Sequence, residues 1–191
     1  MKNAAINGLG RIGRATLKIM LDRDDFNLVA VNDLVPVSNL AYLLKYDTVY
    51  AKYDKDVKSA DGALVINGKE IKVLSEKDPS NLPWKDLGID TVFECTGIFT
   101  KRAELQKHIE AGAKRVVLSA PAKSEDISTV VHGVNTESGE EQIISCASCT
   151  TNCITPVVEV MQRRVGIEKA IMTTVHAYTS TQGIVDSPAK K

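Results

Sequence analysis

The sequence lacks an excess of charge of either sign, because 24 Lys and Arg residues balance 24 Asp and Glu residues. A balanced chain produces no global field that would attract nucleic acid or an anionic membrane. It also lacks any apolar run approaching the roughly 20 residues that are needed to span a bilayer. The first apolar stretch begins within a few residues of Met1, which leaves no room for a signal peptide. We therefore expect a cytoplasmic protein that has neither nucleic-acid nor membrane partners.

Cysteine is scarce and unevenly placed, with Cys95 alone and Cys146, Cys149 and Cys153 close together. This is not the spread of a secreted disulfide framework. Cys146 and Cys149 form a C-x-x-C pair, but a zinc site needs four ligands, and no second Cys pair or His cluster supplies them. A thioredoxin-like pair would stand early in a small domain, whereas this one follows a long α/β stretch. We expect no metal, and dithiol redox chemistry is kept as an alternative.

Cys149 stands where a helix is predicted to begin. Apolar residues at helical spacing predict a helix over about 150–164, and these are Ile154, Val157, Val158, Met161 and Val165. At a helix N-terminus, unpaired N–H groups and the dipole favour the thiolate form of a cysteine. The same N–H groups would stabilise an acyl oxygen bonded beside the sulfur. The hydroxyls of Ser148, Thr150 and Thr151 would add donors for an anion such as phosphate.

His176 ends a β-branched run over residues 171–176 that predicts a strand. A strand returning beside the preceding helix would bring the imidazole back to Cys149, as a Cys–His catalytic pair requires. A cysteine in a helical region is also a common core residue, and a histidine at a strand end often packs or caps. The residues alone leave both interpretations open.

The amino-terminal segment has the order strand, glycine-rich turn, helix, strand. An apolar run leads into a G-x-G-x-x-G motif formed by Gly8, Gly10 and Gly13, and the second predicted strand, 28–32, ends at Asp33. In this context the glycines allow a tight turn, close approach of a pyrophosphate, and close packing of helix on sheet. Asp33 would accept hydrogen bonds from an adenosine ribose and repel a 2′-phosphate, which favours NAD over NADP. The alternative is a glycine-rich turn without a ligand.

Short apolar strands alternate with helical stretches through the rest of the chain, which predicts a mostly parallel sheet. Asn67-Gly68 predicts a type I′ turn in a hairpin over 63–74. Further strands are expected at 91–95, 115–119, 130–131 and 143–146, and a helix is expected over 101–111. Thr96 follows one of these strands and Ser119 ends another, so with Asp33 they would line the carboxyl edge of the sheet, where ligands bind.

We therefore predict an α/β fold in two parts. Residues 1–148 would form a Rossmann-type dinucleotide-binding domain with a mostly parallel sheet. Residues 149–191 would form the incomplete start of an α+β catalytic domain. The sequence ends on a loop at Lys190-Lys191 without a closing element, so we expect an amino-terminal portion of a longer protein.

Several motifs together resemble the phosphorylating glyceraldehyde-3-phosphate dehydrogenase family. They run through the whole chain: N-G-L-G-R-I-G-R at 7–14, N-D at 32–33, L-L-K-Y-D at 43–47, N-L-P-W at 81–84, E-C-T-G at 94–97, L-S-A-P at 118–121, S-C-T-T-N-C at 148–153 and T-T-V-H-A at 173–177. The resemblance implies an NAD-dependent enzyme of glycolysis. Cys149 would attack the aldehyde of glyceraldehyde 3-phosphate, and His176 would act as the base. Inorganic phosphate would then release the thioester as 1,3-bisphosphoglycerate.

The resemblance also implies which residues bind the ligands. Those around the cofactor are Gly8, Gly10, Arg11, Ile12, Gly13, Asp33, Lys77, Thr96 and Ser119. Ser148 and Thr150, beside Cys149, would serve the attacking phosphate, and Thr179 and Thr181 would hold the substrate phosphate. A homotetramer is implied for the full-length enzyme.

The chain departs from the family pattern at two cofactor positions. Cys95 stands where a serine is common, and Lys77 stands where an arginine is frequent, which loses the planar stacking fork of arginine. Two alternatives stay open: erythrose-4-phosphate dehydrogenase, and a non-catalytic NAD-binding module. The stretch after His176, T-S-T-Q at 179–182, looks more like the glyceraldehyde enzyme. Residues 1–191 alone are expected to be inactive.

Overall fold

The computed structural model describes residues 1–136, 139–179 and 184–186. Within these residues one nine-stranded sheet forms the centre of the fold, in the order β3-β4-β5-β2-β1-β6-β7-β9-β8. Its strands are β1 (Lys2–Asn7), β2 (Phe26–Asn32), β3 (Val57–Ala60), β4 (Ala63–Ile66), β5 (Lys69–Leu74), β6 (Thr91–Glu94), β7 (Arg115–Leu118), β8 (Ser128–Thr129) and β9 (Ile143–Ser145). The helices are α1 (Arg11–Leu21), α2 (Val37–Lys45), the 3-10 turn η1 (Pro79–Asn81), α3 (Arg102–Glu110) and α4 (Cys149–Arg164).

The sheet is mostly parallel, as predicted. β1 pairs in parallel with both β2 and β6, and β7 and β9 continue the parallel order outward. Only the β3-β4-β5 meander at one edge of the described sheet is antiparallel, and Asn67 and Gly68 have φ of 47° and 81° in its predicted type I′ turn. The chain passes from β1 to β2 on one side and later to β6 on the other. This reversal of strand order makes a crevice at the carboxyl end of β1, where open α/β sheets bind ligands.

Both faces of the sheet are covered by apolar packing. Strand β1 illustrates the alternation, since Ala4 and Ile6 face the cluster that holds α1, while Ala5 faces the cluster around Trp84. A third cluster joins Leu105 of α3 to β7 and β9. Each fully buried large apolar side chain contributes about 1.5–3 kcal/mol. These layers hold the carboxyl ends of the central strands in a fixed arrangement.

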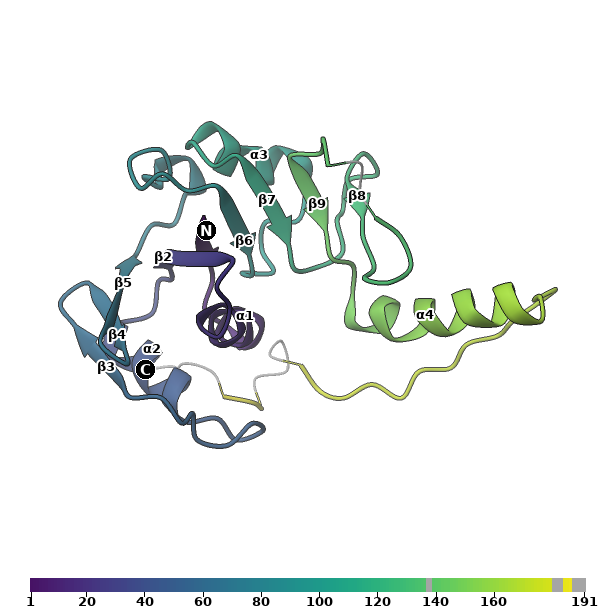
Figure 1. The fold of residues 1–191 in the computed structure, drawn as a ribbon, viewed down its shortest axis with the longest axis horizontal. Coiled ribbons are helices and arrows are strands. Elements are labelled where there is room, and N and C mark those ends of the chain that lie inside the picture. Colours follow the sequence, from purple (N-terminus) through teal and green to yellow (C-terminus); the bar gives the residue numbers. More distant parts are fainter. Residues whose placement is uncertain (137–138, 180–183, 187–191) are drawn as a thin grey trace.

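The part of the chain after β9 is far more exposed. Figure 1 shows α4 extending away from the sheet and the following segment running back below it. No residue of α4 is buried, and residues 171–179 are exposed throughout. None of the helices in the described ranges has the length and apolar character that crossing a bilayer demands.

Two sequence expectations differ from the structure here. The strand predicted at 171–176 is wrong, because this segment has no regular secondary structure. A strand needs a neighbour to pair its N–H and C=O groups, and no strand of the described residues pairs with it. The strand expected at 130–131 instead forms as β8 just before it, in register with Ile144 and Ser145.

Candidate active site

The glycine-rich turn between β1 and α1 is closely packed at two positions. Gly8 has a φ of +91°, and a Cβ there would lie 2.8 Å from the Thr96 backbone. A Cβ on Gly13 would lie 1.9 Å from the Gly8 carbonyl oxygen. Gly10 has open space around it and caps α1 without a side chain. The first turn of α1 is therefore open to an anionic group such as a pyrophosphate.

A cavity of about 470 Å³ opens beside this turn. Most of the predicted cofactor residues line it, namely Gly8, Gly10, Arg11, Asp33, Lys77 and Thr96. Gly13 lies under the turn, and neither Ile12 nor Ser119 is among the lining residues. The volume lies within the roughly 300–1,000 Å³ typical of ligand pockets. The close-packed glycines and the open helix terminus fit a dinucleotide in this cavity.

Asp33 stands at the cavity wall directly after β2. One carboxylate oxygen accepts a hydrogen bond from the Leu9 N–H at 2.7 Å, and the other accepts from the Val35 N–H at 3.0 Å. An ionised carboxylate has about four acceptor sites. Asp33 therefore keeps acceptor capacity for a sugar hydroxyl, as the sequence prediction requires.

Cys149 is the first residue of α4. Ser148 is the N-cap, and its Oγ accepts a hydrogen bond from the Thr151 N–H at 3.0 Å. Ser148 Oγ also lies 2.8 Å from Thr151 Oγ1. The hydroxyls expected to hold an anion are thus partly used in capping the helix. This capping fixes the direction of the first turn and therefore the position of the sulfur.

The sulfur of Cys149 lies 3.2 Å from Nε2 of His176. The other ring nitrogen, Nδ1, lies 2.6 Å from the Ala177 carbonyl oxygen, which can only accept, so Nδ1 carries a proton. The hydrogen bond from His176 lowers the pKa of the Cys149 thiol, and the N–H and hydroxyl of Thr150 act in the same direction. The Ala177 carbonyl, and after it the sulfur, raise the pKa of His176. Both shifts favour a thiolate–imidazolium pair.

The remaining thiols have different surroundings. Burial raises the pKa of Cys95 to about 11, and partial desolvation raises the pKa of Cys146, although that residue as a whole is exposed. Cys153 stands one turn beyond Cys149, where the amphipathic spacing of the helix predicts a buried and unreactive thiol. That prediction is wrong, because no described segment packs over this side of α4 and Cys153 is exposed. No cluster of metal-ligating side chains occurs among the residues that the structure describes.

The predicted phosphate residues are only partly placed. Thr150 is half-buried in the first turn of α4, and Thr179 is exposed. Thr181, and the rest of the predicted stretch up to Gln182, lie outside the described residues. The structure therefore brings Ser148 and Thr150 together with Cys149 and His176, but it does not test the substrate-phosphate prediction.

Sequence reasoning missed two sets of polar contacts at the cavity. Arg14 is buried, and it donates hydrogen bonds to the carbonyl oxygens of Leu9 and Asp186, each at 3.0 Å. Asn7 and Asn32, which also line the cavity, are bonded to each other. For the asparagine pair, the available signal was a polar residue directly after each of two apolar runs, 4–6 and 28–31.

Two family models and several curated relatives match the sequence of this chain. Residues 2–102 match the model described as glyceraldehyde 3-phosphate dehydrogenase, NAD binding domain, and residues 148–191 match the C-terminal domain model of the same enzyme. The chain is 49% identical to the glyceraldehyde-3-phosphate dehydrogenase of Clostridium pasteurianum and 50% identical to that of Thermotoga maritima. In both alignments the whole chain is covered, but only 58% of the relative. With the relative from Geobacillus stearothermophilus it shares 51% identity over 97% of this chain and 56% of the relative.

The chain thus spans little more than half the length of the curated relatives it matches. The matches confirm the predicted resemblance, and together with the mostly parallel sheet they confirm the predicted fold class. They also confirm NAD as the cofactor of the amino-terminal domain. The division at residues 148 and 149 stays a prediction. On this evidence the chain belongs to the glyceraldehyde-3-phosphate dehydrogenase family.

Proposed function

We propose that the protein containing this chain oxidises glyceraldehyde 3-phosphate, with NAD and inorganic phosphate, to 1,3-bisphosphoglycerate. The observation that carries the proposal is the 3.2 Å contact between Cys149 Sγ and His176 Nε2 at the start of α4. α4 follows β9, and β9 runs parallel to the strands that form the cofactor crevice. The thiol and the cofactor cavity therefore belong to the same edge of the sheet.

The chemistry follows from the surroundings of the sulfur. The Cys149 thiolate attacks the aldehyde carbon, and the N–H groups of the first turn of α4 stabilise the oxygen that becomes negative. The protonated Nε2 of His176 gives its proton to that oxygen, which forms the hydroxyl of a thiohemiacetal. As the carbon then loses hydride, Nε2 takes the hydroxyl proton back, which leaves a thioester. When bound, NAD supplies the hydride acceptor. Attack of inorganic phosphate on the thioester carbon releases the Cys149 thiolate and the acyl phosphate.

The residues that would bind the two phosphate groups are assigned from the family resemblance. Ser148 and Thr150 would serve the attacking phosphate, and Thr179 and Thr181 would hold the substrate phosphate. Ser148 Oγ already accepts from the Thr151 N–H, so it can offer its hydroxyl proton to a phosphate oxygen when Thr151 Oγ1 is the donor in the 2.8 Å contact between the two hydroxyls. On the cofactor side, Asp33 would bind the ribose and the first turn of α1 the pyrophosphate. A homotetramer and a cytoplasmic location are further proposals, testable by light scattering and by cell fractionation.

The test uses the protein as its own cells make it, with an intact-mass measurement to establish its length. NADH formation is followed with glyceraldehyde 3-phosphate and, in parallel, with erythrose 4-phosphate. We expect faster turnover of glyceraldehyde 3-phosphate, and loss of turnover in the Cys149→Ser variant. Preference for erythrose 4-phosphate would replace the proposed substrate. NAD binding without turnover of either aldehyde would favour the non-catalytic module.

A further inference from the structure

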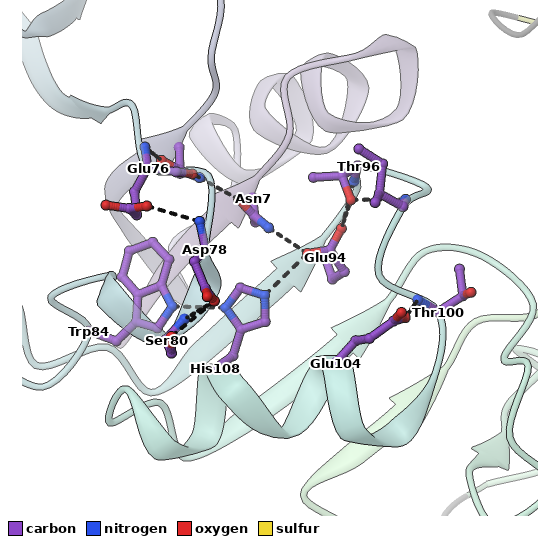
Figure 2. Close-up of polar contacts among 12 residues, drawn as sticks. Asn7, Glu76, Asp78, Ser80, Trp84, Glu94, Thr96, Thr100, Glu104 and His108 are labelled. Atoms are coloured by element: carbon purple, nitrogen blue, oxygen red, sulfur yellow. Dashed lines mark hydrogen bonds and ion pairs between the residues drawn. The ribbon is translucent and has the colours of Figure 1, made fainter.

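Glu94 is a carboxylate buried at the carboxyl end of β6, with no exposed surface. Figure 2 shows it at the centre of a set of polar side chains. Its Oε2 accepts a 2.6 Å hydrogen bond from Asn7 Nδ2 and lies 3.2 Å from His108 Nε2. Its Oε1 accepts from both the N–H and the hydroxyl of Thr96, the N–H at 2.7 Å. Both oxygens are therefore fully engaged.

The partners of His108 fix the direction of its bond to Glu94. The indole Nε1–H of Trp84 donates to His108 Nδ1 at 3.0 Å, and an indole nitrogen cannot accept. Nδ1 therefore carries no proton, and Nε2 must carry one and donate it to Glu94. The imidazole in this arrangement is neutral. The buried Glu94 charge is thus stabilised by hydrogen-bond donors rather than by a cation among these partners.

One branch of these hydrogen bonds runs from Glu94 through Asn7 and Asn32 to the cavity wall that follows β5. Asn7 Oδ1 accepts from Asn32 Nδ2 at 2.7 Å. Asn32 in turn holds the backbone of Glu76 at two points, since Nδ2 donates to the Glu76 oxygen at 2.9 Å and Oδ1 accepts from the Glu76 N–H at 2.8 Å. Glu76 and Lys77 line the cavity. By orienting Asn32, Asn7 therefore helps to fix the position of the backbone at Glu76 in this wall.

The other branch leads to the wall that follows β6. Thr96 directs both of its donors at Glu94, and its Oγ1 accepts a hydrogen bond from the Ile98 N–H at 3.1 Å. Thr96 and Ile98 line the same cavity. The two walls are distant in sequence, and both are joined to Glu94 by hydrogen bonds.

We propose that Glu94 is a positioning residue for the dinucleotide site, which orients Asn7 and Thr96 and through them sets the two walls of the cavity. Glu94 is not among the residues lining the cavity, so it acts through these neighbours. The inference rests on the proposed function in taking NAD as the ligand. It adds that tight NAD binding requires an ionised carboxylate at residue 94, although this residue does not line the cavity.

An amide at residue 94 cannot replace the carboxylate, although it has the same shape. In Glu94→Gln the new NH₂ would face either the donors of Asn7 and His108 or the donors of Thr96. Asn7 cannot turn over without losing its bond from Asn32, and His108 cannot change tautomer without losing Trp84. The Thr96 N–H is fixed in the backbone. Glu94→Gln therefore opposes two fixed donors in one orientation, those of Asn7 and His108, and the fixed Thr96 N–H in the other.

The experiment compares Glu94→Gln with His108→Leu, which removes a neighbour of Glu94 but leaves both branches to the cavity intact. NAD affinity is measured by calorimetry well below the melting temperature of each variant. We expect Glu94→Gln to weaken NAD binding about 10-fold or more, and His108→Leu to lower thermal stability with an affinity change below about 2-fold. Equal NAD affinity in wild type and Glu94→Gln would overturn the proposal.

Amide hydrogen exchange of the nucleotide-free protein separates this inference from the proposed function. Glu94→Gln should raise exchange at the Glu76, Thr96 and Ile98 amides, whereas His108→Leu should not. If the wild type fails to bind NAD while exchange responds in this way, the proposed function fails and the positioning role stands. If Glu94→Gln does not fold, Glu94→Asp is used in its place. The shorter Asp side chain keeps both carboxylate acceptors but moves them away from the donors of Asn7 and Thr96. If Glu94→Asp binds NAD as tightly as His108→Leu does, the proposal is overturned.

Discussion

The carboxylate of Asp33 accepts a 2.7 Å hydrogen bond from the Leu9 N–H, which joins the end of β2 to the glycine-rich turn after β1. The second oxygen is held by the Val35 N–H. Two bonds from rigid backbone leave the carboxylate little freedom to turn away from a ligand. A 2′-phosphate at the adenosine ribose would thus meet a fixed negative charge at the cavity wall.

We therefore expect the protein to bind NAD more tightly than NADP by roughly 1–3 kcal/mol, the range for a mismatched buried polar contact. Calorimetric titration with both cofactors measures the difference. Asp33→Asn keeps the shape and removes the charge, so it should narrow the gap, and Asp33→Ala should narrow it as well. Equal affinities for the two cofactors in the wild type would contradict this assignment of Asp33.

The four cysteines should differ in their reactivity toward alkylating agents. Cys149 should react first, because it is exposed and its hydrogen bond from His176 lowers its pKa. Cys95 should react last, because it is buried and its pKa is raised to about 11. Brief iodoacetamide treatment near neutral pH, followed by peptide mass mapping, gives the order. Earlier labelling of Cys146 or Cys153 would show that exposure rather than thiolate formation decides reactivity here.

The pH dependence of that alkylation should report the contact between Cys149 and His176. A thiol with a lowered pKa is ionised at lower pH, so the wild-type rate should rise at lower pH than is usual for cysteine. His176→Asn removes the charged partner and should move this rise to higher pH. His132→Asn, at an exposed histidine outside the candidate site, is the matched control and should leave the profile unchanged. Coincident profiles for His176→Asn and wild type would mean that His176 does not act on the thiol in solution.

Features that depend on neighbouring residues in sequence were predictable, and features that depend on distant partners were not. The hairpin turn at Asn67-Gly68 and the helix starting at Cys149 follow from local conformational preference and spacing. The strand expected at 171–176 required a second strand to pair with, which no pattern within that segment reveals. The exposure of Cys153 likewise depends on what packs over α4.

The polar network shows the same limit at the cofactor site. Asn7, Asn32 and Glu94 each follow a short apolar run at the end of a strand, and the sequence shows this directly. That they are neighbours follows only from the sheet register, in which Asn7 is paired with both Asn32 and Glu94. Strand order must be known before such a register can be written. The network was therefore visible in the sequence as separate polar residues and not as a unit.

The glycines of the cofactor turn should tolerate substitution unequally. Gly13→Ala would place a Cβ 1.9 Å from the Gly8 carbonyl oxygen, so α1 must move away from the turn. Overpacking of this kind costs about 1–3 kcal/mol or more. Gly10→Ala is the matched control, because its Cβ would have no neighbour within 4 Å. Thermal or urea unfolding should show a large loss of stability for Gly13→Ala and little for Gly10→Ala, and equal losses would contradict the close packing of α1.

A chain made of residues 1–191 alone should be reactive at Cys149 and yet almost silent in turnover. The nucleophile and the base are in contact, but both are exposed, and the segment carrying His176 has no regular secondary structure. Catalysis depends on holding the reacting groups rigidly, since a misplacement of about 1 Å can cost about 100-fold in rate. Exposed reacting groups also admit water to a thioester intermediate.

For that chain we expect NADH formation from glyceraldehyde 3-phosphate, NAD and phosphate at less than about 1% of the rate of a longer relative. Alkylation of Cys149 should nevertheless proceed, because it needs only the thiolate and access to it. The Cys149→Ser variant gives the background rate. Robust turnover that disappears in this variant would show that contact between Cys149 and His176 suffices for catalysis without a rigid, closed site.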